Sequence, residues 1–366
     1  MSRREQYLKA LRNEPFERLT WAPNFDYWLA VNTHRRTVPA PYRGLARNDI
    51  VRAVGGTIWS RVVSVSVSMP DIQTERVEVG DGRWREIVHT ARGDLTRLYV
   101  TQGGEDHSVV LHEHPVKSVD DLPALMEVLR GARFGVDAEP ARKEIEAIGE
   151  DGIVLECAPC VPFIELCKID TGWEQGLYLW FDHQDRIDEV LELYEQVHLE
   201  HIRLLAENSP AVIIHLGDNM DQLMMSPDLF RRYALPFYAK VARIVHGAGK
   251  LLSVHWCGRT RRLLPLLPGA GVDIVEAVVT EPMSDLTVEE ALASLGGQVV
   301  MQGALPSVLM CHEGGSRQDL VRYVRHIVRD VHPRRSFVLG MGDNVPPNAD
   351  FERVRMVSEL VAEAYP

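Results

Sequence analysis

From residue 120 onward, short apolar runs alternate along the chain with longer amphipathic segments. In the longer segments apolar residues recur at helical spacing, which predicts helices at 185–208, 228–247, 261–267, 288–295, 317–328 and 351–364. The apolar runs predict buried strands at 153–155, 211–214, 251–254, 272–275, 298–301 and 337–339. Strands separated by helices are typical of βα units that build a parallel sheet through right-handed crossovers.

The N-terminal third of the chain has a less regular pattern. A helix is predicted at 4–12 and a strand at 18–25, whereas 62–115 alternates apolar and polar residues around glycine-rich turns, as a β-hairpin excursion would. With these strands the count approaches eight, which favours a (β/α)8 barrel over a doubly wound sheet. Because no linker or low-complexity segment divides the chain, residues 1–366 are expected to form a single domain.

Composition limits the classes of partner. Hydrophobic residues make up 45% of the chain and charged residues 25%, which is typical of a soluble globular protein. The net charge of −12 argues against nucleic acid or an anionic membrane as a partner and leaves a small molecule as the expected one. The polar N-terminus lacks the apolar core of a signal peptide, and no run approaches a membrane span, so a cytoplasmic protein is expected.

The strand predicted at 251–254 ends in His255-Trp256-Cys257-Gly258. Side chains alternate faces along a strand, so His255 and Cys257 should point the same way and Trp256 away from them. Imidazole and thiolate are preferred ligands of zinc. A buried thiol beside a hydrogen-bonded core histidine is the alternative interpretation of this motif. The odd number of cysteines, five, argues against a disulfide framework and favours reduced thiols.

Other polar residues also follow the predicted strands, where a barrel places its catalytic groups. Gly-Asp-Asn occurs twice, at 217–219 and 342–344, and either copy can be a tight turn or can provide a functional carboxylate. On the functional interpretation, Asp218 and Asp343 are candidate catalytic acid/base groups, and Asp343 is also a candidate metal ligand with His255 and Cys257. The candidate substrate-binding residues are Asn24, Asp26, Asn219, Glu276, Gln302 and Asn344.

Several segments together resemble the uroporphyrinogen decarboxylase superfamily. They include Met225-Ser-Pro-Asp-Leu-Phe, His255-Trp-Cys-Gly258 and Gly342-Asp-Asn-Val-Pro-Pro347, with further likeness at 10–23, 90–96, 114–122 and 271–274. The resemblance implies a (β/α)8 barrel that often forms a homodimer.

Two branches of that superfamily differ in their chemistry. The true decarboxylases hold their substrate with an arginine-rich loop after the first strand and use no metal, but the corresponding loop here, 24–36, has Asp26 and aromatic residues near the strand end. The other branch comprises corrinoid-dependent methyltransferases with zinc bound by His-x-Cys and a later cysteine. His255 and Cys257 match the first two of those ligands, and Asp343 stands at the third position.

Three functions are therefore compared. The leading hypothesis is a zinc-dependent transferase that moves a methyl group between a small molecule and a corrinoid or thiol. The second is a metal-independent decarboxylase or lyase acting on a small carboxylic acid, with Asp218 or Asp343 as the acid/base group. The third is a non-catalytic protein that binds a corrinoid or another small molecule. The corrinoid-ligand motif Asp-x-His-x-x-Gly is absent, so any corrinoid would be carried by a partner protein.

Overall fold

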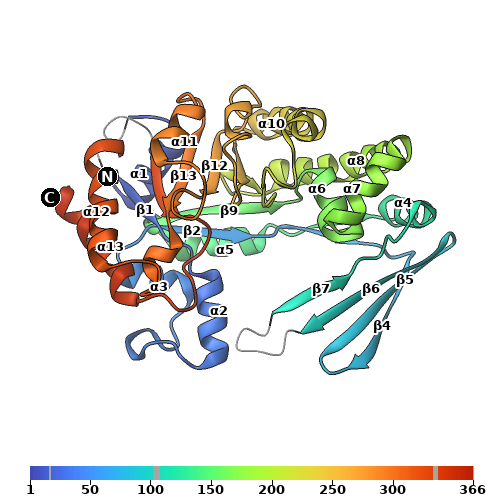
Figure 1. The fold of residues 1–366 in the computed structure, drawn as a ribbon, viewed down its shortest axis with the longest axis horizontal. Helices are drawn as coiled ribbons and strands as arrows, with labels where there is room; N and C mark the ends of the chain where they lie inside the picture. The colour runs from blue at the N-terminus through green and yellow to red at the C-terminus, as the bar shows by residue number, and fades with distance from the viewer. Residues whose placement is uncertain (16–17, 102–107, 333–336, 366) are drawn as a thin grey trace.

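The computed structural model describes residues 1–15, 18–101, 108–332 and 337–365. Eight parallel strands form its centre in the order β1-β14-β13-β12-β11-β10-β9-β2 (Figure 1). The strands are β1 (Thr20–Ala22), β2 (Ile58–Val62), β9 (Gly152–Ala158), β10 (Ile213–Leu216), β11 (Leu251–His255), β12 (Ile274–Val278), β13 (Val300–Leu305) and β14 (Phe337–Met341). The Thr57 N–H donates to the Trp21 carbonyl and links the two end strands. The predicted (β/α)8 barrel is confirmed.

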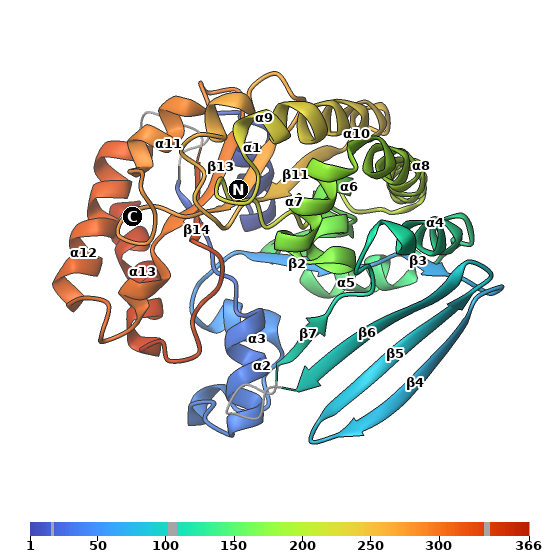
Figure 2. The same cartoon turned by 45° about the vertical axis from the view of Figure 1, so that its right-hand side comes forward.

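Helices surround this barrel on its outside (Figures 1 and 2). They are α1 (Arg3–Leu11), α2 (Asp26–Arg35), α3 (Arg47–Ala53), α4 (Leu122–Arg130), α5 (Glu139–Ile148), α6 (Pro162–Glu165), α7 (Trp173–Asp182), α8 (Gln184–Asn208), α9 (Pro227–Leu229), α10 (Leu235–Gly247), α11 (Val288–Ser294), α12 (Arg317–His326) and α13 (Phe351–Ala364). Within the described ranges, no helix combines the length and the apolar character needed to cross a bilayer.

The barrel interior is a separate apolar core that receives one or two buried side chains from each strand except β11, whose partly buried Leu251 packs against it. Its members are Ala22, Trp59, Ile153, Leu155, Ile213, Ile274, Val300 and Val338, together with Tyr7, Ala10 and Leu11 of α1. Helix α1 contacts the strands at their N-terminal ends, where Arg4 donates a hydrogen bond to the Gly152 carbonyl. It therefore closes the floor of the barrel, and the opposite, C-terminal end remains for chemistry.

A four-stranded antiparallel sheet stands beside the barrel, on the side opposite α12 and α13 (Figure 2). Its strands are β4 (Gln73–Gly80), β5 (Arg83–Thr90), β6 (Gly93–Thr101) and β7 (Val109–Glu113). Asp81 and Gly82, between β4 and β5, both have positive φ, as the commonest hairpin turn requires. A short ribbon of β3 (Val65–Ser68) and β8 (Arg133–Val136) adjoins this sheet. Strands β3 to β7 lie within the predicted excursion 62–115, of which 102–107 are outside the described residues, whereas β8 follows it.

Two local predictions were wrong. The segment 261–267 contains only a short 3-10 turn, η6 (Leu264–Leu266), because Pro265 has no N–H to donate and disfavours the helical conformation of the residue before it. The predicted loop 24–36 is largely helix α2, whose buried Trp28, Val31 and Asn32 recur at helical spacing. The helix predicted at 228–247 is present but begins as α9 and then passes through a π-helical segment, η5 (Phe230–Ala234), before α10.

Candidate functional site

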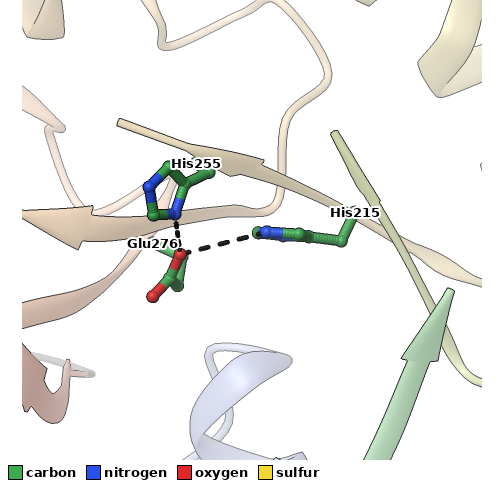
Figure 3. A group of neighbouring side chains, drawn as sticks. All are labelled: His215, His255 and Glu276. Carbon is green, nitrogen blue, oxygen red and sulfur yellow. Dashed lines mark hydrogen bonds and ion pairs between the residues drawn. The ribbon is translucent and has the colours of Figure 1, made fainter. Parts of the chain in front are cut away.

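Three buried polar side chains meet inside the barrel near the C-terminal ends of adjacent strands. They are His215 of β10, His255 of β11 and Glu276 of β12, and they have one potential metal-binding atom each within 4.8 Å of the others. We call this group the inner triad (Figure 3). It sits two residues beyond the interior positions Ile213 and Ile274, as strand alternation requires. Within the described residues the inner triad is a possible metal-binding group.

Glu276 lies between the two imidazoles. Its Oε2 is 2.5 Å from Nδ1 of His255 and 3.9 Å from Nε2 of His215, while Nδ1 of His215 is 2.9 Å from the Ser253 hydroxyl. The pairing of β12 with β13 shifts register between Val275 and Val278, and Ala277 has a φ of 66°. Such bulges reorient neighbouring side chains, and this one lies directly beside Glu276.

The two histidines carry opposite pKa shifts. Burial lowers the pKa of His255, but the Glu276 carboxylate and the hydrogen bonds to Glu276 and Cys257 outweigh burial and raise this pKa well above 6.5. Burial lowers the pKa of His215 well below 6.5, and the charges of His255 and Arg61 lower it further. The barrel therefore holds one imidazolium paired with Glu276 and one neutral imidazole.

On its other side His255 faces Cys257 and Asp343. The Asp343 Oδ1 is 3.7 Å from Nε2 of His255, and the neighbouring Cys257 contributes to the rise in the His255 pKa. Asp343 has a φ of 98°, a conformation that only glycine adopts without strain, and Asn344 donates a 2.8 Å hydrogen bond to it. Burial raises the pKa of Asp343 above its ordinary value. We call His255, Cys257 and Asp343 the outer triad.

The outer triad opens into a cavity of about 390 Å³, which we call the mouth cavity. Cys257, Asp343 and Asn344 line it together with the apolar side chains of Val279, Met283 and Pro346. None of the three buried members of the inner triad lines this cavity, so His255 reaches it only through Cys257 and Asp343. A small molecule in the mouth cavity would therefore meet the outer triad first.

Asp218 and Asn219 differ from the second Gly-Asp-Asn triplet. Asp218 is fully buried, and its two oxygens accept hydrogen bonds from the Val161 N–H and the Tyr238 hydroxyl. Burial raises the pKa of Asp218 to about 6. Asn219 is exposed and has a φ of 51°, which fits the turn interpretation of its triplet. The catalytic role of Asp218 and the binding role of Asn219 stay predictions.

The remaining predicted substrate-binding residues lie at the strand ends but already have protein partners. Gln302 accepts a 2.6 Å hydrogen bond from the hydroxyl of Tyr7, which reaches up from the barrel floor. The Asn24 side chain accepts from the Asp26 N–H, and the Asp26 carboxylate pairs with Arg47 and Arg61.

Sequence reasoning missed two residues on the inward face of β2, the buried Trp59 and the exposed Arg61 at the strand's C-terminal end. The excursion was expected to begin at residue 62, and strand β2 just before it was not recognised, so Trp59 and Arg61 were not considered. They have the same i, i+2 spacing as His255 and Cys257, and Trp59 belongs to the interior core. That spacing was the signal that could have identified them.

The sequence was also compared with models of protein families. The model of the family "Uroporphyrinogen decarboxylase (URO-D)" matches residues 158–364, more than half of the chain. The chain belongs to the uroporphyrinogen decarboxylase family. All members of both triads lie within the matched segment.

Individual proteins similar to this chain have low sequence identity to it. A uroporphyrinogen decarboxylase from Arthrobacter sp. (strain FB24) is 28% identical over 137 residues, which is 37% of this chain and 37% of that protein. The chain thus matches little more than a third of the length of that curated relative. A methyltransferase from Methanosarcina mazei has a similar structure, with a TM-score of 0.62, 15% identity and full coverage of both chains. At this identity the structural likeness supports the fold.

Proposed function

We propose that this protein is a zinc-dependent transferase that moves a methyl group between a small molecule and a thiol or corrinoid acceptor. In this proposal the outer triad, His255, Cys257 and Asp343, holds the zinc. The observation that carries the proposal is the double contact of His255. Its Nδ1 is fixed by Glu276 while its Nε2 faces Asp343 and Cys257 beside the mouth cavity.

The donor set of the outer triad fits zinc. One imidazole nitrogen, one thiolate and one carboxylate oxygen are ligand types that zinc accepts, and three protein ligands are typical of catalytic sites. A carboxylate that binds the far nitrogen of a zinc-ligating histidine is the common arrangement around such ions, and Glu276 stands in that position. The inner triad also places three donor atoms within 4.8 Å of one another, but Oε2 of Glu276 and Nδ1 of His215 already have partners in His255 and Ser253, and neither residue lines the mouth cavity.

Bound zinc would lower the pKa of a thiol acceptor or polarise the oxygen of a methoxy group. The chain's own side chains orient the metal ligands and form the walls of the cavity. Glu276 accepts the Nδ1 proton of His255, and release of the Nε2 proton on metal binding would leave the lone pair of Nε2 facing Asp343. Val279, Met283 and Pro346 give that cavity an apolar wall, and Asn344 holds Asp343 in place. The volume of about 390 Å³ suits a small molecule.

The partners of this activity are also proposals. A corrinoid acceptor would arrive on a separate protein, because the chain lacks the motif that ligates a corrinoid. A cytoplasmic location and a homodimer are the expectations that accompany this assignment.

A second candidate is a metal-independent decarboxylase or lyase that acts on a small carboxylic acid. Two raised pKa values favour it. Burial raises the pKa of Asp218 to about 6, and burial also raises the pKa of Asp343. Carboxyl groups with raised pKa values can donate and accept protons near neutral pH. Asp343 is the better placed of the two, because it lines the mouth cavity and Asp218 does not.

Metal analysis separates these candidates. Metal content would be measured by mass spectrometry after zinc loading and dialysis, for wild type, Cys257→Ser, Asp343→Asn and His215→Asn. We expect near-stoichiometric zinc in wild type and His215→Asn, its loss in Cys257→Ser and weaker retention in Asp343→Asn. The reverse pattern would move the metal to the inner triad. A wild type that binds no zinc would overturn the transferase assignment and leave the lyase.

Activity follows as the second step. Transfer of a labelled methyl group from methylated thiols, amines or methoxy compounds to a thiol or to reduced cobalamin would be assayed with the zinc-loaded protein. Transfer that Cys257→Ser abolishes supports the proposal. Release of carbon dioxide from a small acid by the metal-free protein, without methyl transfer by the loaded protein, contradicts it.

A further inference from the structure

Strand β2 ends beside the inner triad with a guanidinium that the proposed chemistry does not use. We propose that Arg61 binds a carboxylate group of the substrate, so that the enzyme acts on small carboxylic acids held by one end at Arg61. The inference rests on the proposed function only in taking the C-terminal end of the barrel as the substrate site.

The position of Arg61 follows from strand alternation. Trp59 is 2% exposed and belongs to the barrel interior, and Arg61 is the next residue on the same face of β2. The Arg61 guanidinium carbon is 5.4 Å from the centroid of the Trp59 ring, and that ring is 6.4 Å from the ring of His215. Trp59 therefore separates Arg61 from the inner triad by the thickness of one side chain.

Arg61 has unused hydrogen-bond donors. Its Nη2 donates to Asp26, and its Nε and Nη1 make no hydrogen bond to any residue that the structure describes. Arg47 shares the same Asp26, but each of its three nitrogens has a partner, because it also donates to the Trp59 carbonyl and the Ser60 hydroxyl. The indole N–H of Trp59 is buried and likewise has no partner among the described residues.

The charge of Arg61 acts on groups around the barrel end. It opposes the rise that burial causes in the pKa of Cys157 and of Asp343, and it adds to the lowering of the pKa of His215. These residues come from β9, from the loop after β14 and from β10. Arg61 therefore lies at the C-terminal end of the barrel, where the substrate is expected to bind.

A carboxylate is the ligand that these donors suit. The guanidinium fork binds a planar carboxylate through two parallel hydrogen bonds, whereas Asp26 takes only one hydrogen bond from Arg61, through Nη2, and turns its other oxygen to Arg47. Glu144 also acts on Arg47, and Glu276 also acts on Arg61, so charge alone does not select the ligand. On its outer side Arg61 lines a separate cavity of about 280 Å³, together with Asp26 and Glu144. The unused Nε and Nη1 donors of Arg61, with the unpartnered indole N–H of Trp59, are what a substrate carboxylate would bind.

The test uses metal-free protein, so that a carboxylate cannot bind through zinc. Benzoate and its neutral counterpart benzamide would be titrated calorimetrically into chelator-treated wild type, Arg61→Met, Arg61→Lys, Asp26→Asn and Arg262→Met. Arg262 is exposed and does not line the mouth cavity, so its variant removes the same charge elsewhere. Inorganic phosphate would be titrated in parallel to separate a general anion site from a carboxylate site.

We expect benzoate to bind wild type and Arg262→Met equally, at least about tenfold more weakly to Arg61→Met, and more tightly to Asp26→Asn, which frees one edge of the fork. Arg61→Lys should be intermediate because lysine keeps the charge and loses the fork. Benzamide should bind at least tenfold more weakly than benzoate. Equal binding of benzoate to wild type and Arg61→Met, no benzoate binding to either, or a preference for phosphate would each overturn the inference. None of these results depends on zinc, so they test the role of Arg61 alone. Failure of the zinc assignment would be seen in the metal analysis instead.

Discussion

Glu276 determines which nitrogen of His255 is available for chemistry. The 2.5 Å contact to Nδ1 holds the proton there and leaves Nε2 facing Asp343 and Cys257. Glu276 is itself buried and has no role in lining the mouth cavity. Its effect on a bound metal would therefore act through the orientation and basicity of His255, which are the two properties that such carboxylates control.

Glu276→Gln is expected to weaken zinc binding about 10- to 100-fold, because the amide cannot accept the Nδ1 proton as strongly as a carboxylate. The dissociation constant would be measured by competition with a chromophoric chelator. Glu156→Gln provides the control, since Glu156 is an equally buried carboxylate on β9 that binds Ser64 and Ser209. Unchanged zinc affinity in Glu276→Gln, or an equal loss in Glu156→Gln, would contradict the role given to Glu276.

Individual site residues could be predicted only where a short sequence pattern decides their position. The i, i+2 spacing of His255 and Cys257 at a strand end is such a pattern, and the structure places both beside Asp343. The two Gly-Asp-Asn triplets look alike in sequence, yet Asp218 is enclosed by Val161 and Tyr238 while Asp343 lines the mouth cavity. That difference arises from the loops packed around each triplet, which residue types do not reveal.

At the scale of elements, strands β2 and β9 approach each other too closely for a side chain at the start of β9. A Cβ added at Gly152 would lie 1.9 Å from the carbonyl oxygen of Ile58, its partner in the parallel pairing. Because the obstacle is backbone, it can move only if the two strands separate. The close pairing of β9 with β2, the strand that contains Arg61, therefore requires glycine at position 152.

Gly152→Ala is expected to lower the free energy of unfolding by about 3 kcal/mol, at the upper end of overpacking costs, measured by chemical denaturation. Gly247 at the end of α10 is the matched control, because a Cβ there meets nothing within 4 Å and its φ is not positive. Gly247→Ala should be neutral or stabilising by up to about 1 kcal/mol. Equal stability of the two variants would show that the strands separate without cost.

The elements themselves were largely predictable from periodicity. Helix α13 was predicted with its observed bounds, and α8 within one residue, because their apolar residues recur without interruption. The failures have local causes. Pro265 interrupts an otherwise helical pattern at 261–267, and α2 carries a polar residue, Asn32, on its buried face, where its amide donates to the Trp28 and Pro347 carbonyls. A hydrophobic pattern cannot anticipate a buried asparagine that the tertiary structure satisfies.

At the scale of the whole molecule, a buried ionic contact joins the four-stranded sheet to the barrel. Arg97 of β6 reaches Asp170 in the π-helical segment η4 (Leu166–Thr171), with 3.4 Å between Nη2 and Oδ1. Asp170 also accepts a hydrogen bond from the hydroxyl of Tyr194 on α8. Sequence patterns predicted the sheet as an excursion but not this contact, because Arg97 and Asp170 are 73 positions apart.

The burial of Asp170 should make stability depend on pH. Burial raises the pKa of Asp170 to about 6, against an ordinary value of 3.8, although Tyr194 and Arg97 both oppose the rise. The folded protein therefore binds the Asp170 proton more tightly than the unfolded chain does. Between pH 4 and pH 6 the unfolded chain has already lost this proton, so wild type loses stability as the pH rises through that window.

Asp170→Asn removes this titration. We expect the free energy of unfolding of Asp170→Asn, relative to wild type, to improve by up to about 3 kcal/mol as the pH is raised from 4 to 7, since one pKa unit corresponds to about 1.4 kcal/mol. The comparison would use denaturation with urea at several pH values. Tyr194→Phe is the contrast, because loss of its hydrogen bond should raise the pKa of Asp170 further and extend the fall in stability to higher pH. The difference in the free energy of unfolding between Asp170→Asn and wild type could instead stay constant from pH 4 to pH 7. That result would show that Asp170 remains ionised in the folded protein because the Arg97 contact outweighs burial.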